Sequence, residues 1–167
     1  MKTTALDADP ALFDPGEREF VETIREHGWF QTNVFEEADS PGFCFTTGFW
    51  VSAQAPELII FSMRGEVVNA LLWDLYRRIR AGLTPRVGMR FDDLSNHPLC
   101  LMPVAKEHYF EHLGWSRWFY AGDDFPCLQL VWSDPADRFP WEPGFDPDFA
   151  ASQPDLSDGG WTVARVQ

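Results

Sequence analysis

The residues with the clearest chemical potential lie in a five-residue string, H-Y-F-E-H, that begins at His108. This string matches H-x-x-E-H, in which two histidines on one helix face, here His108 and His112, bind zinc. The glutamate of such a motif, Glu111, acts as a general base on the metal-bound water. A zinc hydrolase needs a third ligand from another element, for which His97 and Asp93 are the candidates.

The flanking sequence weakens this hypothesis. Pro103 lies five residues before His108, and Gly114 lies two residues after His112, which leaves room for about two helical turns. A structural or surface pair of histidines explains the same spacing. We therefore keep a metal-dependent hydrolase as the alternative, expect zinc only in that case, and leave open whether the chain is an enzyme.

A second set of candidates lies in a segment dense in aromatic rings, from His108 to Phe149, which holds 12 of the 26 Phe, Trp and Tyr residues. Gln129 is the one polar residue of a predicted strand, and a buried polar group must find a partner. We predict an aromatic-lined pocket in which polar side chains orient a ligand. The candidate ligand-binding residues are Thr47, His108, Tyr109, Trp118, Tyr120, Gln129 and Trp132. The alternative is a buried hydrogen-bond network that fixes the register of the strands.

Other chemistries have little support in the sequence. There is no G-x-S-x-G string for a serine nucleophile and no glycine-rich loop for a nucleotide. The net charge of −13 opposes binding to nucleic acid, which requires clustered Lys and Arg. The chain has no apolar run of about 18 residues, so we expect no membrane span. It also lacks the apolar region of a secretory signal. The cysteines form no C-x-x-C pair, and we expect buried thiols in a reducing cytoplasm.

The pattern of apolar residues predicts a single α+β domain with a mostly antiparallel sheet of about five to six strands and two main helices. Asp14 and Glu17 form a helix start, and Gly28 ends that helix. The expected strands are 29–35, 43–49, 57–63, 85–91, 99–104 and 128–132, and the other expected helices are 68–79 and 106–113. We assign 1–13 as a flexible N-terminus, 14–150 as the domain with an irregular aromatic- and Pro-rich C-terminal segment, and 151–167 as a tail.

Several separate strings carry a family resemblance. They are His27–Phe30, Phe43–Phe49, Pro56–Phe61, His108-Tyr109, Trp118–Tyr120, Phe125–Trp132 and Phe139–Trp141. In this order they resemble the bacterial domain-of-unknown-function family 4262 over roughly residues 18–150. Where the family pattern has Tyr, Leu and Pro, this chain has Phe45, Phe49 and Ser133. Phe45 therefore lacks the phenol hydroxyl of the family's Tyr, which puts any role of that hydroxyl in doubt here. The resemblance implies a small cytosolic bacterial protein and no established activity.

Taken together, these observations favour a non-catalytic binding or accessory protein in the cytoplasm, with a small molecule or a peptide as its ligand. They predict no nucleic acid and no membrane among its partners. A protein partner or a homo-oligomer stays open.

Overall fold

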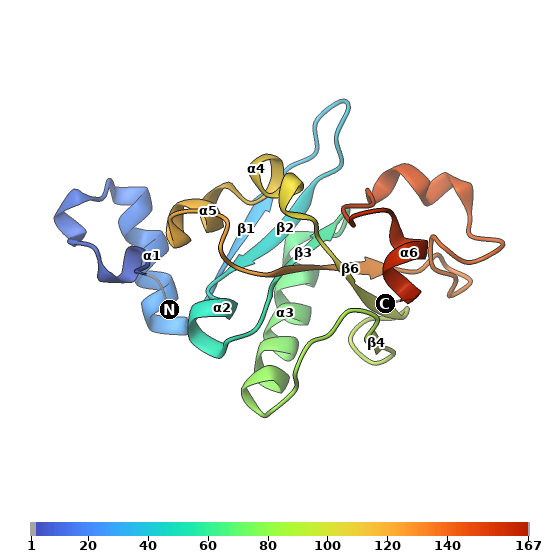
Figure 1. Cartoon of the computed structure of the whole chain (residues 1–167), viewed down its shortest axis with the longest axis horizontal. Coiled ribbons are helices and arrows are strands. Elements are labelled where there is room, and N and C mark those ends of the chain that lie inside the picture. Colours follow the sequence, from blue (N-terminus) through green and yellow to red (C-terminus); the bar gives the residue numbers. More distant parts are fainter. Residues whose placement is uncertain (1–2, 167) are drawn as a thin grey trace.

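The computed structural model describes residues 3–166 and contains one six-stranded sheet (Figure 1). The strands follow the order β1-β2-β3-β6-β5-β4, and every neighbouring pair is antiparallel except β3 and β6. Their bounds are β1 Phe30–Val34, β2 Phe43–Thr47, β3 Glu57–Phe61, β4 Arg90–Phe91, β5 Leu99–Pro103 and β6 Cys127–Trp132. The predicted α+β class and mostly antiparallel sheet are confirmed.

The two long helices are the two that the sequence predicts. They are α1 (Pro15–His27) and α3 (Gly65–Arg80). Asp14 and Glu17 close a capping box at the start of α1, and Gly28 ends it in a left-handed conformation. The shorter helices are α2 Phe49–Ala53, α4 Tyr109–His112, α5 Gly114–Tyr120 and α6 Trp161–Val166. Within residues 3–166, no helix is both long and apolar enough to cross a membrane.

Successive side chains of a strand point to opposite faces of the sheet. Both faces are buried because helices cover each of them. Helix α3 packs Val68, Leu72 and Leu75 on the face that carries Leu58 and Ile60 of β3. Helices α1, α4 and α5 cover the opposite face at the other strand positions. That second cluster includes Phe20, Ile24, Phe45, Ile59, Phe61, Tyr109 and Phe119. The apolar run Leu58–Phe61 of β3 therefore reflects the central position of that strand in the sheet.

Both segments outside the predicted domain, the N-terminus 1–13 and the tail 151–167, contain short helices among the described residues. Residues 5–7 and 10–12 form the 3-10 helices η1 and η2, and Leu6 and Phe13 pack against the α1 cluster. At the other end, η4 (Pro147–Ser152) leads to α6, and Trp161 is buried against β5 and β6. Figure 1 shows α1 at one end of the molecule and α6 at the other. Each terminal segment thus buries apolar side chains that a sequence rich in Pro, Asp and Gly conceals.

Candidate functional site

A buried carboxylate organises the region where β2, β3 and α5 meet. Glu57, the first residue of β3, is completely buried. Its carboxylate accepts hydrogen bonds from the hydroxyls of Thr46, at 2.7 Å, and Tyr120. The backbone N–H groups of residues 48–50 donate to it as well, each at 3.1 Å. These five donors surround the carboxylate and leave no open position beside it.

The direction of the two hydroxyl hydrogen bonds to Glu57 is determined by neighbouring backbone groups. Leu58 N–H donates to the Thr46 hydroxyl, and Val51 N–H donates to the Tyr120 hydroxyl, so both hydroxyls turn their own hydrogens toward Glu57. Burial raises the pKa of Glu57, and the hydrogen bonds from Tyr120 and Thr46 work against this rise. Because every neighbour donates, the arrangement fits an ionised carboxylate that anchors α2 and α5.

Two of the predicted ligand-binding residues, Thr47 and Tyr120, belong to this network. The hydroxyls of Thr47 and Ser116 lie 2.6 Å apart, and Ser116 also donates to the carbonyl of Thr46. All of these side chains are buried. The contacts attach helix α5 to the end of β2, as in the hydrogen-bond network that was the alternative to a ligand pocket.

The polar groups of the other predicted residues bond to groups outside the Glu57 network, although Tyr109 and Tyr120 pack on the same ring, Phe125. Tyr109 donates to the carbonyl of Phe125, and burial raises its pKa. Gln129 donates to the carbonyl of Pro154, and the Trp132 indole donates to the carbonyl of Phe61. The Trp118 ring packs edge-on against Phe13, and His108 Nε2 lies 3.7 Å from the Glu107 carboxylate. These contacts do not join all seven side chains, and a ligand pocket formed by them stays a prediction.

The zinc motif spans two short elements, with His108 at the end of the 3-10 helix η3 (Lys106–His108) and His112 at the end of α4. Helix α4 spans only four residues, and the rings of His108 and His112 are 6.4 Å apart between centroids. The His112 Nδ1 lies 3.1 Å from the carbonyl of His108, and its ring packs on Phe43 and Phe61. The two rings therefore take up different environments.

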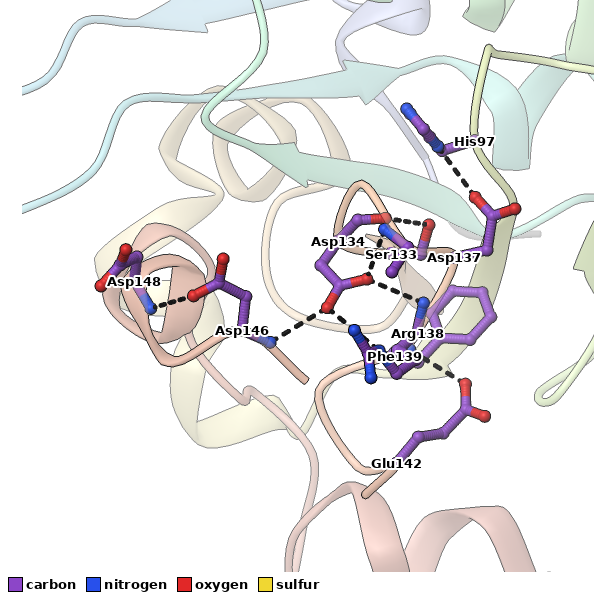
Figure 2. Close-up of polar contacts among 10 residues, drawn as sticks. His97, Ser133, Asp134, Asp137, Arg138, Phe139, Glu142, Asp146 and Asp148 are labelled. Atoms are coloured by element: carbon purple, nitrogen blue, oxygen red, sulfur yellow. Dashed lines mark hydrogen bonds and ion pairs between the residues drawn. The ribbon is translucent and has the colours of Figure 1, made fainter. Parts of the chain in front are cut away.

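The proposed third ligands have partners of their own. The His97 Nδ1 lies 2.8 Å from the Asp137 carboxylate (Figure 2), and Asp93 forms a bidentate pair with Arg78. Among residues 3–166, no group of three or more His, Cys, Asp or Glu side chains is placed to hold a metal ion. The geometry thus gives the hydrolase hypothesis no ligand set within the described part of the chain.

Asp134 is a second buried carboxylate, at the loop that follows β6 (Figure 2). It accepts hydrogen bonds from the N–H groups of Ala136, Arg138 and Asp146, at 2.9–3.0 Å. Burial alone would raise its pKa, but these donors and the Arg138 charge outweigh that effect, and the pKa lies below its ordinary value. Asp134 therefore holds the loop as far as Asp146 in one shape.

Two hollows of the described surface lie beside strand β1. One, of about 650 Å³, is lined by the end of α1, by β1 and by residues of α3 between Gly65 and Trp73. Its aromatic walls are Trp29, Phe30 and Trp73. A second hollow, of about 630 Å³, shares Asn33, Gly65 and Glu66 with the first. We call the first hollow the β1–α3 groove. Its volume is in the range of small-molecule sites.

Three carboxamides form a chain across this groove. Asn69 donates to Gln31 Oε1, at 3.1 Å, and Gln31 Nε2 donates to Asn33 Oδ1, at 2.8 Å. These bonds leave Asn33 Nδ2 and Asn69 Oδ1 with no hydrogen bond among the described residues. The groove thus combines aromatic rings with an oriented donor on Asn33 and an oriented acceptor on Asn69.

The model of a family described as a domain of unknown function, DUF4262, matches residues 23–146. The chain belongs to the DUF4262 family. The match covers all six strands and helices α2 to α5, and it stops before η4 and α6. Neither a curated protein nor a solved structure matches the chain.

Two polar arrangements of this DUF4262 domain were not predicted from the sequence, the Glu57 network and the carboxamide chain of the β1–α3 groove. Glu57 had a signal, because a carboxylate directly before an unbroken apolar strand must be buried or lie at its edge. Gln31 and Asn33 had a weaker one, because residues two apart in a strand share a face. Nothing in the sequence indicates that Asn69 of α3 lies beside them.

Proposed function

We propose that this DUF4262 domain is a non-catalytic binding protein that holds a small uncharged molecule in the β1–α3 groove. The observation that carries the proposal is the carboxamide chain Asn69–Gln31–Asn33. Each amide in it is oriented by its neighbour, so the donor at Asn33 and the acceptor at Asn69 are held in place before a ligand arrives. Binding to such a preorganised site costs little side-chain entropy.

The lining of the groove favours a flat, neutral ligand. Trp29, Phe30 and Trp73 offer apolar ring surfaces, and the amides offer neutral hydrogen bonds. The titratable side chains that line it, His27 and Glu66, are both exposed. Carboxamides bind without transferring protons, which supports a binding role in preference to acid–base catalysis.

The rest of the chain supports a cytoplasmic setting for this function. Cys44, Cys100 and Cys127 are all buried, as expected of thiols in a reducing compartment. The net charge of −13 opposes nucleic acid as a partner. We infer a cytoplasmic binding or accessory protein on these grounds.

The test is a melting-temperature screen against three classes of neutral probe: nucleosides, N-acetyl aromatic amino-acid amides and methyl glycosides. A ligand at about 100 times its Kd stabilises by roughly 2.7 kcal/mol, which raises Tm by about 5–10 °C for a chain of this size. Asn33→Asp removes the free donor yet keeps the oxygen that accepts from Gln31, so it should abolish the shift. Asn96→Asp makes the same charge change in an exposed loop and should preserve it. The proposal fails if no probe shifts Tm, or if the shift survives Asn33→Asp.

A further inference from the structure

The segment from Ser152 to Ser157, which we call the C-terminal strap, is held largely through its backbone. The Ser62 hydroxyl donates to the carbonyl of Ser152. Gln129 Nε2 donates to the carbonyl of Pro154 at 3.0 Å, and the N–H of Ala105 donates to the carbonyl of Leu156 at 2.8 Å. Such bonds do not depend on which side chains the strap carries. Domains that bind extended peptides obtain affinity in this way.

Two side chains of the strap complete its contacts with the rest of the domain. The Gln153 carboxamide pairs with both backbone groups of Trp132: its Nε2 donates to the carbonyl at 2.8 Å, and its Oε1 accepts from the N–H at 3.2 Å. Leu156 enters the apolar cluster beneath Val104 and Tyr109. Gln153 and Leu156 are each 2% exposed. The strap thus combines backbone recognition with two side-chain anchors three residues apart.

One hydrogen bond of this arrangement is missing. Gln129 is 0% exposed, and its Oε1 has no partner among the described residues. A carboxamide can pair with the C=O and the N–H of a single residue, as Gln153 does with Trp132. Gln129 faces Pro154, which offers a carbonyl but has no N–H. The strap therefore leaves the buried Gln129 Oε1 unsatisfied, which weakens the binding of the strap to the rest of the domain.

We propose that the surface beneath the strap, formed by Ser62, Ala105, Gln129 and Trp132, is a peptide-binding site that the strap occupies within its own chain. We call this surface the strap groove, and it is distinct from the β1–α3 groove. The ligand we assign is an extended segment of a partner protein. It carries a carboxamide and an aliphatic side chain at the places of Gln153 and Leu156, with a residue other than proline facing Gln129. The backbone N–H of that residue donates the missing hydrogen bond to Gln129 Oε1.

Two observations favour a partner protein over a second copy of this chain. The strap lies outside residues 23–146, so the strap groove is formed by the family domain, whereas its occupant is not part of that match. The strap of a second copy would bring the same proline and leave Gln129 equally unsatisfied. A peptide of different sequence can remove this defect, which gives it an advantage over the strap.

The test uses the full chain with Gln153→Ala and Leu156→Ala, which weakens the strap and leaves the strap groove unchanged. The probes are two acetylated peptides based on residues 151–158, A-S-Q-P-D-L-S-D and A-S-Q-A-D-L-S-D. The alanine peptide should bind about five- to tenfold more tightly, as one additional hydrogen bond implies. In a Gln129→Leu background this advantage should disappear, and the alanine peptide should bind no more tightly than the proline peptide. Equal binding without that substitution, or no binding of either peptide at millimolar concentration, overturns the proposal.

A second measurement on the intact chain covers the case in which the double variant does not fold. Pro154→Ala lowers stability through the unfolded state equally in any background. In the wild-type background it also supplies an N–H to Gln129, so its effect on Tm should be more favourable, by about 2 °C or more, than in Gln129→Leu. The same effect in both backgrounds refutes the missing bond. A dimer of the intact chain in sedimentation that disappears in the Gln153→Ala, Leu156→Ala variant would assign the strap groove to a second copy and overturn the choice of partner.

Discussion

Tyr120 donates its phenol hydrogen to the buried carboxylate of Glu57, and so joins the end of helix α5 to the start of strand β3. The two residues are 63 positions apart in the chain. Both are buried, and Val51 N–H fixes the direction of the phenol by donating to it. Removal of the hydroxyl therefore leaves a buried charge with one donor fewer.

We expect Tyr120→Phe to lower the free energy of unfolding by about 1.5–3 kcal/mol, because the lost hydrogen bond is to a charged group. Tyr109→Phe is the matched control. It removes a hydroxyl that donates to the neutral carbonyl of Phe125, and should cost about 1 kcal/mol. Urea denaturation of both variants measures the difference. Equal losses would show that Glu57 gains nothing special from its phenol donor.

We expect Asp134→Asn to destabilise the protein at neutral pH, with a difference that disappears in acid. The folded pKa of Asp134 is lowered, so its stabilising contribution is complete above the unfolded pKa of about 3.9. This contribution is lost as pH falls through the lower, folded pKa. Melting curves of wild type and variant between pH 6 and pH 2 should converge toward the acid end.

Asp148→Asn is the control for this pH series. Asp148 lies nearby on η4, and its side chain is exposed. It should follow the wild-type curve throughout. A constant gap between wild type and Asp134→Asn over the whole pH range would contradict the predicted linkage.

Gly48→Ala should be one of the most damaging small substitutions. Its φ is +123°, and an added Cβ would lie 2.3 Å from the carbonyl oxygen of Gly28 and 2.7 Å from Trp29 Cα. Gly82 has a similar φ of +119° but nothing within 4 Å of the added Cβ. We therefore expect Gly82→Ala to cost about 1–2 kcal/mol from backbone conformation alone, and Gly48→Ala to cost clearly more. Comparable losses in chemical denaturation would show that the backbone near Gly48 can shift at low cost.

Zinc should not change the stability of the protein. His108 and His112 have no third ligand among the described residues, so we expect Tm to stay within about 1 °C after chelator treatment and after addition of equimolar zinc. The measurement is a melting curve of protein purified without an affinity tag. A zinc-dependent rise in Tm that is lost in both His108→Ala and His112→Ala would restore the hydrolase hypothesis.

The sequence by itself determined the elements whose causes are local. The cap of α1 at Asp14 and its end at Gly28 depend on residues within one helical turn, and both are found as expected. The buried face of α3 follows from apolar residues at helical spacing, from Val68 to Ile79. The apolar run Leu58–Phe61 predicted a central strand, and β3 lies in the middle of the sheet.

Only the tertiary structure decided which polar groups meet. Gln129 was correctly expected to need a partner, but the partner is the carbonyl of Pro154, in a segment expected to be a tail. The carboxamide chain of the β1–α3 groove joins β1 to α3 across 38 residues of sequence, between Gln31 and Asn69. Periodicity records which face of an element is buried, whereas a hydrogen bond depends on an orientation set by the packing of both elements. For that reason the fold class was predictable, and the positions of its polar sites were not.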